Sequence, residues 1–501
     1  MILVWLMVIL FAGGIGAALA ESRGAEHPRA VALAAILLDV FLVILMLVSP
    51  QTLGLGTPDT VAQLGQQGEW LVLFQADWVP RFGASFIFGV DGLGLMMVAL
   101  TVFLGLISLG AAWGEIHERS GFFYFNLLWT LAGVIGVFTA LDLFLFFFFW
   151  EVMLIPMYFI IAIWGHENKE YAAMKFFIFT QVTGLLMLLS ILVLVYFHYS
   201  TTNVLTFNYF QLLGTKLPAS TATWVMLGFF IAFATKLPAV PFHNWLPDAH
   251  SQAPTAGSVI LAGILLKTGA YGLLRFTVPL FPDESLGFAP YAMMLGTISI
   301  LYTAKVAFAQ NDLKRLIAYT SVSHMGFVLL GIYAWNAQAV QGAVMTMLAH
   351  GFSAAALFML AGGLQHRIHT RDMDKMGGFW GVAPKLSFMA LFFTVAAVGM
   401  PGLGNFVGEF LVLLGSFQVS RVTTAFAALG LVVAAVYSLI VIQKVFHGKN
   451  KNNYKMEDLT TMEFLCFALM MIGLLWMGMY PQTMLNMAQP SLQALNVVFA
   501  G

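Results

Sequence analysis

The sequence predicts an all-α integral membrane protein with about fourteen membrane-spanning helices. The chain of 501 residues is 60% hydrophobic and only 9% charged, whereas an average soluble domain is about 25% charged. Apolar runs of about 18 or more residues recur along the whole length, as membrane-crossing helices require. No segment alternates like a strand of an outer-membrane barrel, and helices satisfy their own backbone hydrogen bonds in lipid.

The predicted spans group into an N-terminal segment, two repeats and a final helix. The first span is apolar from its second residue and has no basic stretch before it, which predicts a membrane helix rather than a cleaved signal peptide. The groups are a three-helix segment (1–111), a five-helix repeat (121–279), a second such repeat (288–446) and a C-terminal helix (460–480). The spans lie near 2–20, 30–48, 88–111, 121–138, 140–163, 172–197, 221–241, 257–279, 288–309, 314–333, 340–365, 386–417, 422–446 and 460–480.

Basic residues favour one set of loops. Sixteen of the 22 Lys and Arg lie in loops after odd-numbered spans or at the helix ends beside them. Four lie on the other side, namely Arg81, Lys216, Arg275 and Arg421, and the remaining two are inside spans. Such a bias follows the positive-inside rule. It predicts that both termini face away from the cytoplasm.

Two spans are interrupted by proline and glycine. In the seventh, Lys236 is followed by Pro238 and Pro241, and in the twelfth, Gly399-Met400-Pro401-Gly402 leads to Glu409. Proline removes a backbone donor and glycine permits unusual dihedral angles. Broken helices at corresponding places in two halves indicate inverted repeats with a site at the break. Spans 4–8 would then repeat as spans 9–13, and an odd number of helices reverses the second copy. The alternative is that these residues only kink two helices.

Ionisable residues inside spans are the strongest functional signal. A charge at the bilayer centre costs at least ~2.5–3.5 kcal/mol, so it usually faces a protein interior or a water-filled path. Six of these residues are the main candidates: Glu151, Lys236, Lys267, His324, His350 and Glu409. Together they predict a path for an ion.

Glu151 lies about 11 residues from either end of its span, roughly 16 Å deep at 1.5 Å per residue. Its sequence neighbours offer no partner, so the carboxylate is neutral or paired with a cation from another helix. Lys236 is the nearest candidate in the repeat. A partly desolvated lysine can exchange protons near neutral pH, so moving Glu151 away would release a proton from Lys236. A static structural ion pair is the alternative.

The other four residues suit later steps of the same path. Lys267 lies between glycines that leave room for water, which suits a central relay. His324 and His350 can take and give protons near pH 7, although either could instead be a packing residue. Neither has a metal-ligand partner at helical spacing. Glu409 lies past the break in its span, toward the outside, and is the expected outlet group.

Five further residues are weaker candidates. His243, Asp248 and His250 follow the seventh span on the cytoplasmic side, where they either feed protons inward or cap the broken helix. Asp142 lies about 180° around its helix from Glu151, at a span end, and is expected to be interfacial. Asp39 lies outside the repeats and is expected to serve packing or a subunit contact.

Several functions are excluded. The net charge of −1 gives no electrostatic case for nucleic acid. Cys466 is the only cysteine, which excludes a cysteine-ligated iron–sulfur cluster and an internal disulfide. No dinucleotide fingerprint or P-loop is present. The energy for transport must therefore come from an ion gradient or a partner.

Four long stretches resemble the antiporter-like membrane subunits shared by respiratory complex I, the NADH-quinone oxidoreductase, and multi-subunit cation/proton antiporters. The stretches are Phe149–Tyr158, Ala234–Thr255, Asp312–Gly326 and Gly399–Phe410. The resemblance implies fourteen helices with inverted repeats, and proton pumping driven by quinone reduction elsewhere in the complex. It implies that FMN, iron–sulfur clusters and the quinone site belong to other subunits. It also implies antiporter-like neighbours on both sides and a bacterial inner membrane.

The resemblance also assigns roles to the residues within spans. It implies that Glu151 pairs with Lys236, that Lys267 is the central relay, and that Glu409 faces the outlet. His324 and His350 match histidines along the same polar axis. We therefore expect a proton-translocating subunit with no redox site of its own. The alternatives are a subunit of a cation/proton antiporter or of a membrane-bound hydrogenase, or a structural spacer that conducts nothing.

Overall fold

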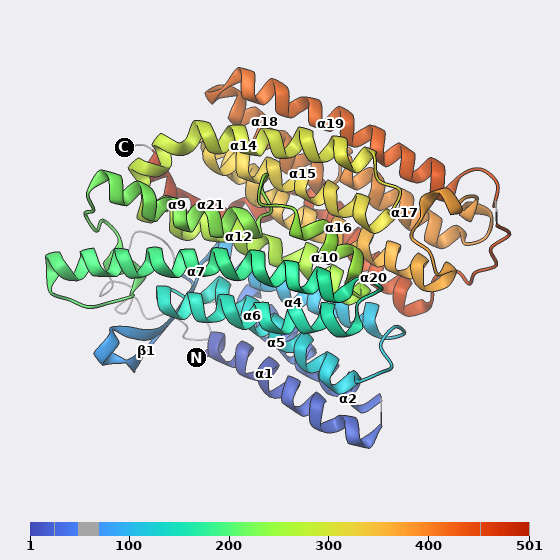
Figure 1. The fold of residues 1–501 in the computed structure, drawn as a ribbon, viewed down its shortest axis with the longest axis horizontal. Coiled ribbons are helices and arrows are strands. Elements are labelled where there is room, and N and C mark those ends of the chain that lie inside the picture. The colour runs from blue at the N-terminus through green and yellow to red at the C-terminus, as the bar shows by residue number, and fades with distance from the viewer. Residues whose placement is uncertain (25, 49–69, 451, 500–501) are drawn as a thin grey trace.

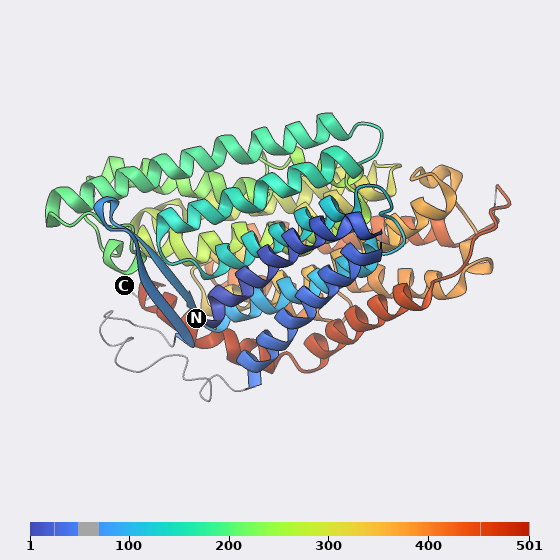
Figure 2. The same cartoon turned by 90° about the horizontal axis from the view of Figure 1, so that it is seen from below.

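The computed structural model describes residues 1–24, 26–48, 70–450 and 452–499. Its long helices run side by side along the longest axis of the molecule (Figures 1 and 2). Lys451, one of the sixteen basic residues counted above, lies outside the described residues, as do residues 49–69 of the predicted N-terminal segment.

Thirteen helices among the described residues are long and apolar enough to cross a membrane. They are α1 (Ile2–Ala20), α2 (Glu26–Val48), α4 (Gly92–Ala112), α5 (Ser120–Thr139), α6 (Leu143–Trp164), α7 (Lys169–Thr202), α9 (Ala219–Lys236), the composite helix Thr255–Leu280, α14 (Pro282–Phe308), α15 (Leu313–Tyr333), α16 (Ala337–Ile368), α19 (Arg421–Val441) continued by the π-helical turn η7 (Ile442–Phe446), and α20 (Thr461–Met479). Each overlaps a predicted span. The predicted span 386–417 consists of two shorter apolar helices, α17 (Pro384–Ala397) and α18 (Gly404–Val419).

The composite helix Thr255–Leu280 lies at the centre of the bundle. It is assembled from α11 (Thr255–Ile260), the π turn η3 (Leu261–Leu265), α12 (Leu266–Gly272), the π turn η4 (Leu273–Thr277) and α13 (Val278–Leu280). Its apolar window is 100% buried, against 94% for α15 and 89% for α16. The helices that carry Lys267, His324 and His350 are thus the most enclosed of the thirteen candidate spans among the described residues.

Side-chain caps determine where several spans begin. Asp91, Asp142, Asp312 and Asn336 are the N-cap residues of α4, α6, α15 and α16, and each carboxylate or amide oxygen accepts from one or two backbone N–H groups of the first turn. Such caps satisfy donors that have no partner within the helix. Thr460 and Glu463 form a reciprocal capping box at α20.

The predicted all-helical fold is wrong in one place. The strands β1 (Val72–Val79) and β2 (Ala84–Val90) form an antiparallel hairpin that pairs Val72 with Val90. The helix that was predicted to begin at residue 88 therefore begins at Gly92. The prediction was too early because the apolar end of β2 runs directly into the span and cannot be told from it by hydropathy. The helices α8 (Tyr209–Leu212), α10 (Trp245–Gln252) and α21 (Gln482–Phe499) add to the predicted elements.

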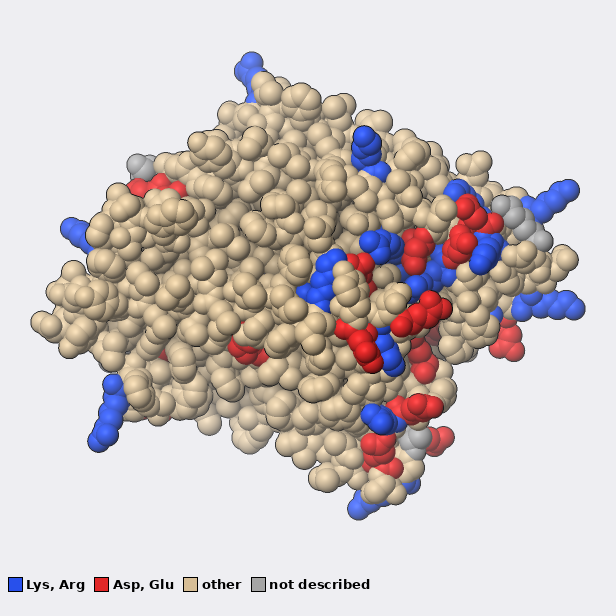
Figure 3. Space-filling view, viewed as in Figure 1, with Lys and Arg blue, Asp and Glu red and all other residues tan. Residues whose placement is uncertain are grey.

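Charged side chains gather at one end of the molecule, on the right in Figure 3. The hairpin, α21 and the N-terminus lie toward the other end (Figures 1 and 2). Most of the face between the two ends in Figure 3 carries neither acidic nor basic residues. Helices of this composition, with charge confined to their ends, are typical of a bundle embedded in a bilayer.

Candidate functional site

Lys267 is held by a carbonyl group and a histidine in the centre of the bundle. It is 0% exposed, and its Nζ donates to the Ala262 carbonyl at 2.6 Å and lies 2.7 Å from His350 Nδ1. Ala262 lies in the π turn η3, five residues before the lysine. π turns of this kind are rare and recur at functional sites. The wide turn brings a backbone acceptor within reach of the ammonium.

His324 and Glu409 form a second buried pair on the far side of His350. His324 Nδ1 lies 2.7 Å from Glu409 Oε1, and the two side chains are 5% and 2% exposed. The rings of His324 and His350 have their centroids 5.7 Å apart. The Nε2 atoms of both histidines and Oε2 of Glu409 have no hydrogen-bond partner among the described residues. Lys267, His350, His324 and Glu409 therefore form one polar line across α12, α16, α15 and α18.

Lys236 ends α9 and is enclosed by aromatic rings. Its Nζ lies 5.4 Å from the Trp150 ring centroid and 5.2 Å from that of Phe176, and it has no hydrogen-bond partner within the described chain. Aromatic faces attract such a cation electrostatically. Glu151, next to Trp150, has no ion pair with Lys236 within 4.0 Å, and its Oε1 is also without a partner among the described residues. The two residues lie within electrostatic range of each other without direct contact, so their ion pair stays a prediction.

The two lysine-bearing helices pack directly on each other. A Cβ atom on Gly269 would lie 2.5 Å from the Phe233 carbonyl oxygen and 2.6 Å from the Leu237 amide nitrogen. Only glycine permits backbones to approach this closely. The end of α9 beside Lys236 is thereby held against the turn that follows Lys267.

The three loop candidates have different surroundings. His250, on α10, is 0% exposed and stacks on Phe358 with ring centroids 4.1 Å apart, and neither ring nitrogen has a partner among the described residues. The His243 ring lies 5.7 Å from the Tyr302 ring and 6.3 Å from the Tyr319 ring, centroid to centroid.

Asp248 is an ion-pair residue at the charged end. It accepts from Lys175 at 2.6 Å and from Arg315 at 2.8 Å. The two contacts hold α10 between α7 and α15. This geometry favours a structural role for Asp248.

The two aspartates of uncertain role also differ. Asp142 Oδ1 accepts from the backbone N–H groups of Phe144 and Leu145, and its Oδ2 accepts from that of Ser85 at 2.9 Å. Burial raises the pKa of Asp142 to about 6 against the opposing effect of these N–H groups. Asp39 is 1% exposed, and neither carboxyl oxygen has a partner within the described residues.

Sequence reasoning missed two buried charged clusters. Arg275 was counted only as an outer basic residue, yet its Nη2 lies 2.5 Å from Asp91 Oδ2 in a buried pair. Lys314 was counted only as a cytoplasmic one, yet it is 0% exposed and lies 3.4 Å from His166 Nε2. Arg275 lies near the end of its predicted span and Lys314 at the start of its own, and charged residues at span ends are normally solvated, so their positions gave no signal of burial.

The described part of the chain contains no group of three or more His, Cys, Asp or Glu side chains that could hold a metal ion. The arrangement can instead bind and pass protons. It contains an amine in contact with one imidazole and a second imidazole in contact with a carboxylate, and both imidazoles and the carboxylate have an atom without a partner among the described residues. These are the groups that proton relays in membrane proteins use.

Comparisons with known proteins identify the family of this chain. Residues 140–438 match the family model described as NADH:quinone oxidoreductase/Mrp antiporter, TM. The chain is 52% identical to NADH-quinone oxidoreductase subunit M of Escherichia coli K12, over 97% of this chain and 96% of that protein. It is 50% identical to the subunit of the same name from Pseudomonas aeruginosa, over 99% and 97% of the two chains.

A solved structure extends the likeness to the whole fold. A chain of respiratory complex I from Thermus thermophilus with bound NADH superposes with a TM-score of 0.88 at 29% identity, covering 100% of this chain and 99% of the other. The family model covers more than half of the sequence, and the curated relatives cover nearly all of it. The chain belongs to the NADH:quinone oxidoreductase/Mrp antiporter family of membrane proteins, among the antiporter-like subunits of respiratory complex I.

Proposed function

We propose that this chain translocates protons across a bacterial inner membrane as the M-type subunit of NADH-quinone oxidoreductase. The path comprises Glu151 and Lys236, then Lys267, and then His350, His324 and Glu409. The observation that carries the proposal is the buried line of 2.7 Å contacts from Lys267 to His350 and from His324 to Glu409. Burying such groups costs free energy, and ionisable residues kept inside a membrane protein usually have a function.

The proton path has two parts, one at Glu151 and Lys236 and the other from Lys267 to Glu409. The helices that carry Lys236 and Lys267 pack against each other at Gly269. A charged Glu151 near Lys236 favours the protonated lysine, and movement of that charge favours proton release toward Lys267. From Lys267 the proton passes through the two imidazoles to the Glu409 carboxylate, which leads outward. Quinone reduction in other subunits drives this transfer by changing the electrostatic field at these residues.

Local duplication supports the inverted repeat. Asp142 caps α6 and forms an isolated antiparallel bridge with Asn208, and Asp312 caps α15 and forms the same bridge with Asp372. Asn208 and Asp372 each cap the short helix that follows. We infer that residues 121–279 and 288–446 are copies of one unit, with 1–111 and 460–480 flanking them.

The interruptions fall at matching places in the proposed copies. Helix α9 ends at Lys236 and α10 begins at Trp245, while α17 ends at Ala397 and α18 begins at Gly404. His250 is five residues past the start of α10, and Glu409 is five residues past the start of α18. Each interrupted helix would thus present one ionisable residue to the central line.

The topology and partners follow from the charge distribution and the family. The charged end faces the cytoplasm, and both termini are periplasmic. Antiporter-like subunits of the same complex lie on both sides. The FMN, iron–sulfur clusters and quinone of the complex are held by other subunits, and this chain contributes no redox site.

The test uses the complete complex in sealed vesicles. Lys236→Ala and Glu151→Ala are each expected to lower the number of protons pumped per NADH oxidised. Lys216→Ala, at an exposed lysine in the loop before α9, is the matched control and leaves pumping unchanged. Wild-type pumping in both axis variants would contradict the proposal and leave the chain as a structural spacer.

A further inference from the structure

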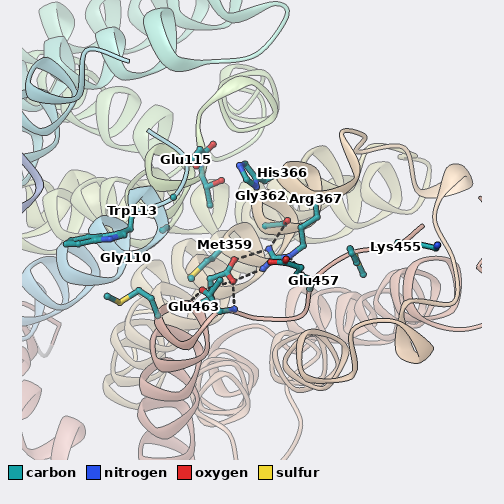
Figure 4. Close-up of a pocket in the computed structure, with 17 residues that line it drawn as sticks. Gly110, Trp113, Glu115, Met359, Gly362, His366, Arg367, Lys455, Glu457 and Glu463 are labelled. Carbon is teal, nitrogen blue, oxygen red and sulfur yellow. Dashed lines mark hydrogen bonds and ion pairs between the residues drawn. The ribbon is translucent and has the colours of Figure 1, made fainter. Parts of the chain in front are cut away.

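The two ends of the composite helix Thr255–Leu280 have different surroundings. Its first residue lines a cavity of about 570 Å³ that opens at the charged end of the molecule. In Figure 4, Glu115 and His366 lie at one side of this cavity, and the ion pair of Arg367 with Glu463 lies across from them. Solvent therefore reaches the start of the helix, whereas its opposite end carries a buried arginine.

That arginine stands in line with the central lysine. Lys267, Tyr271 and Arg275 follow one another at intervals of four residues, which places them on one face of a helix. At 1.5 Å per residue, Arg275 lies about 12 Å beyond Lys267 toward the outer end. Lys267 and Tyr271 are 0% exposed, and the Arg275 side chain is 11% exposed. Arg275 is thus the layer of this line that lies nearest to the outside.

The Arg275 guanidinium is held by four contacts. Its Nη2 lies 2.5 Å from Asp91 Oδ2, and its Nε donates to Tyr271 Oη at 3.2 Å. Its Cζ lies 5.0 Å from the Trp70 ring centroid and 5.4 Å from that of Tyr271. Aromatic rings within about 6 Å attract a guanidinium. The positive charge is therefore fixed in place at the outer end of the helix.

The hydrogen bonds around Arg275 do not form a path for protons. Tyr271 Oη accepts from Arg275 and donates to the Phe138 carbonyl at 2.9 Å, so its proton points away from both charged groups. A guanidinium has five N–H donors and no acceptor, and it stays protonated in proteins. A proton that reaches Asp91 from outside therefore meets a group that cannot take it up. The fixed positive charge also repels protons and other cations, as arginines in selective pores do.

Helix α21 supports this arrangement from the outer side. The backbone N–H of Leu93, in the first turn of α4, donates to Ser491 Oγ at 3.2 Å. A side chain at Gly92 would collide with the Met487 carbonyl oxygen of α21. The backbones of α4 and α21 are thus in close contact beside Asp91, the N-cap residue of α4. This packing holds the carboxylate that positions the arginine.

Stability alone does not account for an ion pair at this position. Replacing a buried ion pair by apolar residues of similar volume is often neutral or stabilising. A buried arginine two turns from a lysine that carries protons has instead a direct electrostatic effect on that lysine.

We propose that Arg275, positioned by Asp91 and Tyr271, is an electrostatic seal that stops protons from returning from the outer side of the membrane to Lys267. This inference rests on the proposed function and adds a direction to it. With the outer end of its own helix closed, Lys267 passes its proton only to His350.

The first test measures passive proton leak through the complete complex in sealed vesicles without NADH. The periplasmic side is made acidic, and a trapped pH-sensitive dye reports how fast the gradient collapses. Arg275→Gln is expected to raise this rate about tenfold, the effect of one charge at about 12 Å and an effective dielectric constant of about 20. Arg421→Gln is the matched control, because it removes the same charge from an exposed arginine on the outer side. A wild-type rate in Arg275→Gln, or an equal rise in Arg421→Gln, would overturn the seal.

The second test separates the charge of Arg275 from the ion pair. Asp91→Asn breaks the same pair as Arg275→Gln, but it keeps the guanidinium between the outside and Lys267. The leak of Asp91→Asn should therefore stay well below that of Arg275→Gln. Equal leak in the two variants would show that the pair only maintains the packing, and the seal would be refuted.

The third test asks whether the leak uses the central lysine. Arg275→Gln/Lys267→Ala should leak no faster than the wild type, because the proton then has no lysine to reach. A leak that persists without Lys267 would come from a hole in the fold and would count against the seal. If Arg275→Gln does not assemble, Arg275→Gln/Asp91→Asn takes its place with and without Lys267→Ala, since it leaves no unpaired charge. The expected result is again a leak that Lys267→Ala removes.

The failure of the seal can be told apart from failure of the proposed function. If Lys236→Ala and Glu151→Ala pump as the wild type does, the function itself is wrong. If these two lose pumping while Arg275→Gln holds the gradient as the wild type does, only the seal is wrong.

Discussion

Arg275 and Lys444 occupy the same position, the third residue, in two five-residue π-helical turns, η4 and η7. Each forms an ion pair with an aspartate, but the two environments differ. Arg275 and Asp91 are 11% and 6% exposed, with 2.5 Å between Nη2 and Oδ2. Lys444 and Asp374 are 39% and 54% exposed, with 2.8 Å between Nζ and Oδ1. The same local geometry thus supports one buried and one solvated pair.

The buried pair joins the central helix to the outer end of the bundle. Arg275 Nε donates to Tyr271 Oη at 3.2 Å, and Tyr271 Oη donates to the Phe138 carbonyl at 2.9 Å. Burial by itself raises the pKa of Asp91, but Arg275 and the Gly94 N–H outweigh it and hold that pKa below its usual value. Asp91 is therefore charged at neutral pH and fully engaged.

We expect Arg275→Gln or Asp91→Asn to destabilise the subunit by about 3–5 kcal/mol, because each leaves an uncompensated buried charge. The double variant should lose less than either single one. The measurement is the thermal unfolding of the purified complex. Lys444→Gln, in the solvated pair, should change stability by less than about 1 kcal/mol. Equal losses at Arg275 and Lys444 would contradict the importance of burial.

Gly269 offers a purely steric prediction. A Cβ there would meet backbone atoms of Phe233 and Leu237 at 2.5–2.6 Å, and backbone cannot rotate away as a side chain can. Gly269→Ala should therefore separate the helices that carry Lys236 and Lys267 and lower both assembly and pumping. Gly287→Ala is the control, since nothing lies within 4 Å of its Cβ position. Normal pumping in an assembled Gly269→Ala complex would show that this approach does not matter.

The pair of His324 and Glu409 can be tested by a double-mutant cycle. If both act in the same transfer step, His324→Gln and Glu409→Gln should each stop the pumping that depends on this subunit, and the double variant should be no worse. Protons pumped per NADH is the readout. His198→Gln is the control, because that histidine bonds Thr215 Oγ1 at 3.0 Å, away from the line. Additive partial losses would place the two residues in separate steps.

The membrane spans and the candidate residues could be named from the sequence because both depend on contrast with lipid. Each span is a long apolar run, and Lys236, Lys267, Glu151 and Glu409 stand out within such runs. The contacts between these residues could not be predicted in the same way. They depend on helix rotation, and the π turn Leu261–Leu265 changes the phase of the helix just before Lys267.

The elements that the sequence did not predict lack that contrast. Helix α21 carries several amide side chains and a proline, so it is not apolar enough to stand out as a span. Strand β2 is continuous in hydropathy with α4. Lys314 and Glu115 lie near span ends, where charged residues are normally solvated, so only the packing of α10 and α15 shows that Lys314 is buried.

His166 should make stability depend on pH. Burial, and then the positive charges of Lys314, Arg371 and Lys169, lower the pKa of His166 to about 3 from 6.5. The folded state therefore binds fewer protons than the unfolded state between these values, so stability falls as pH decreases below about 6.5.

His166→Gln removes this dependence. The thermal unfolding temperature of the variant complex should fall less than that of the wild type between about pH 7.5 and pH 5.5, because only the wild type must exclude a proton from this site. Other buried histidines titrate in both proteins, so the difference between the two slopes isolates His166. Identical slopes would show that His166 takes up a proton in the folded state, and the positive cluster around it would then have to rearrange.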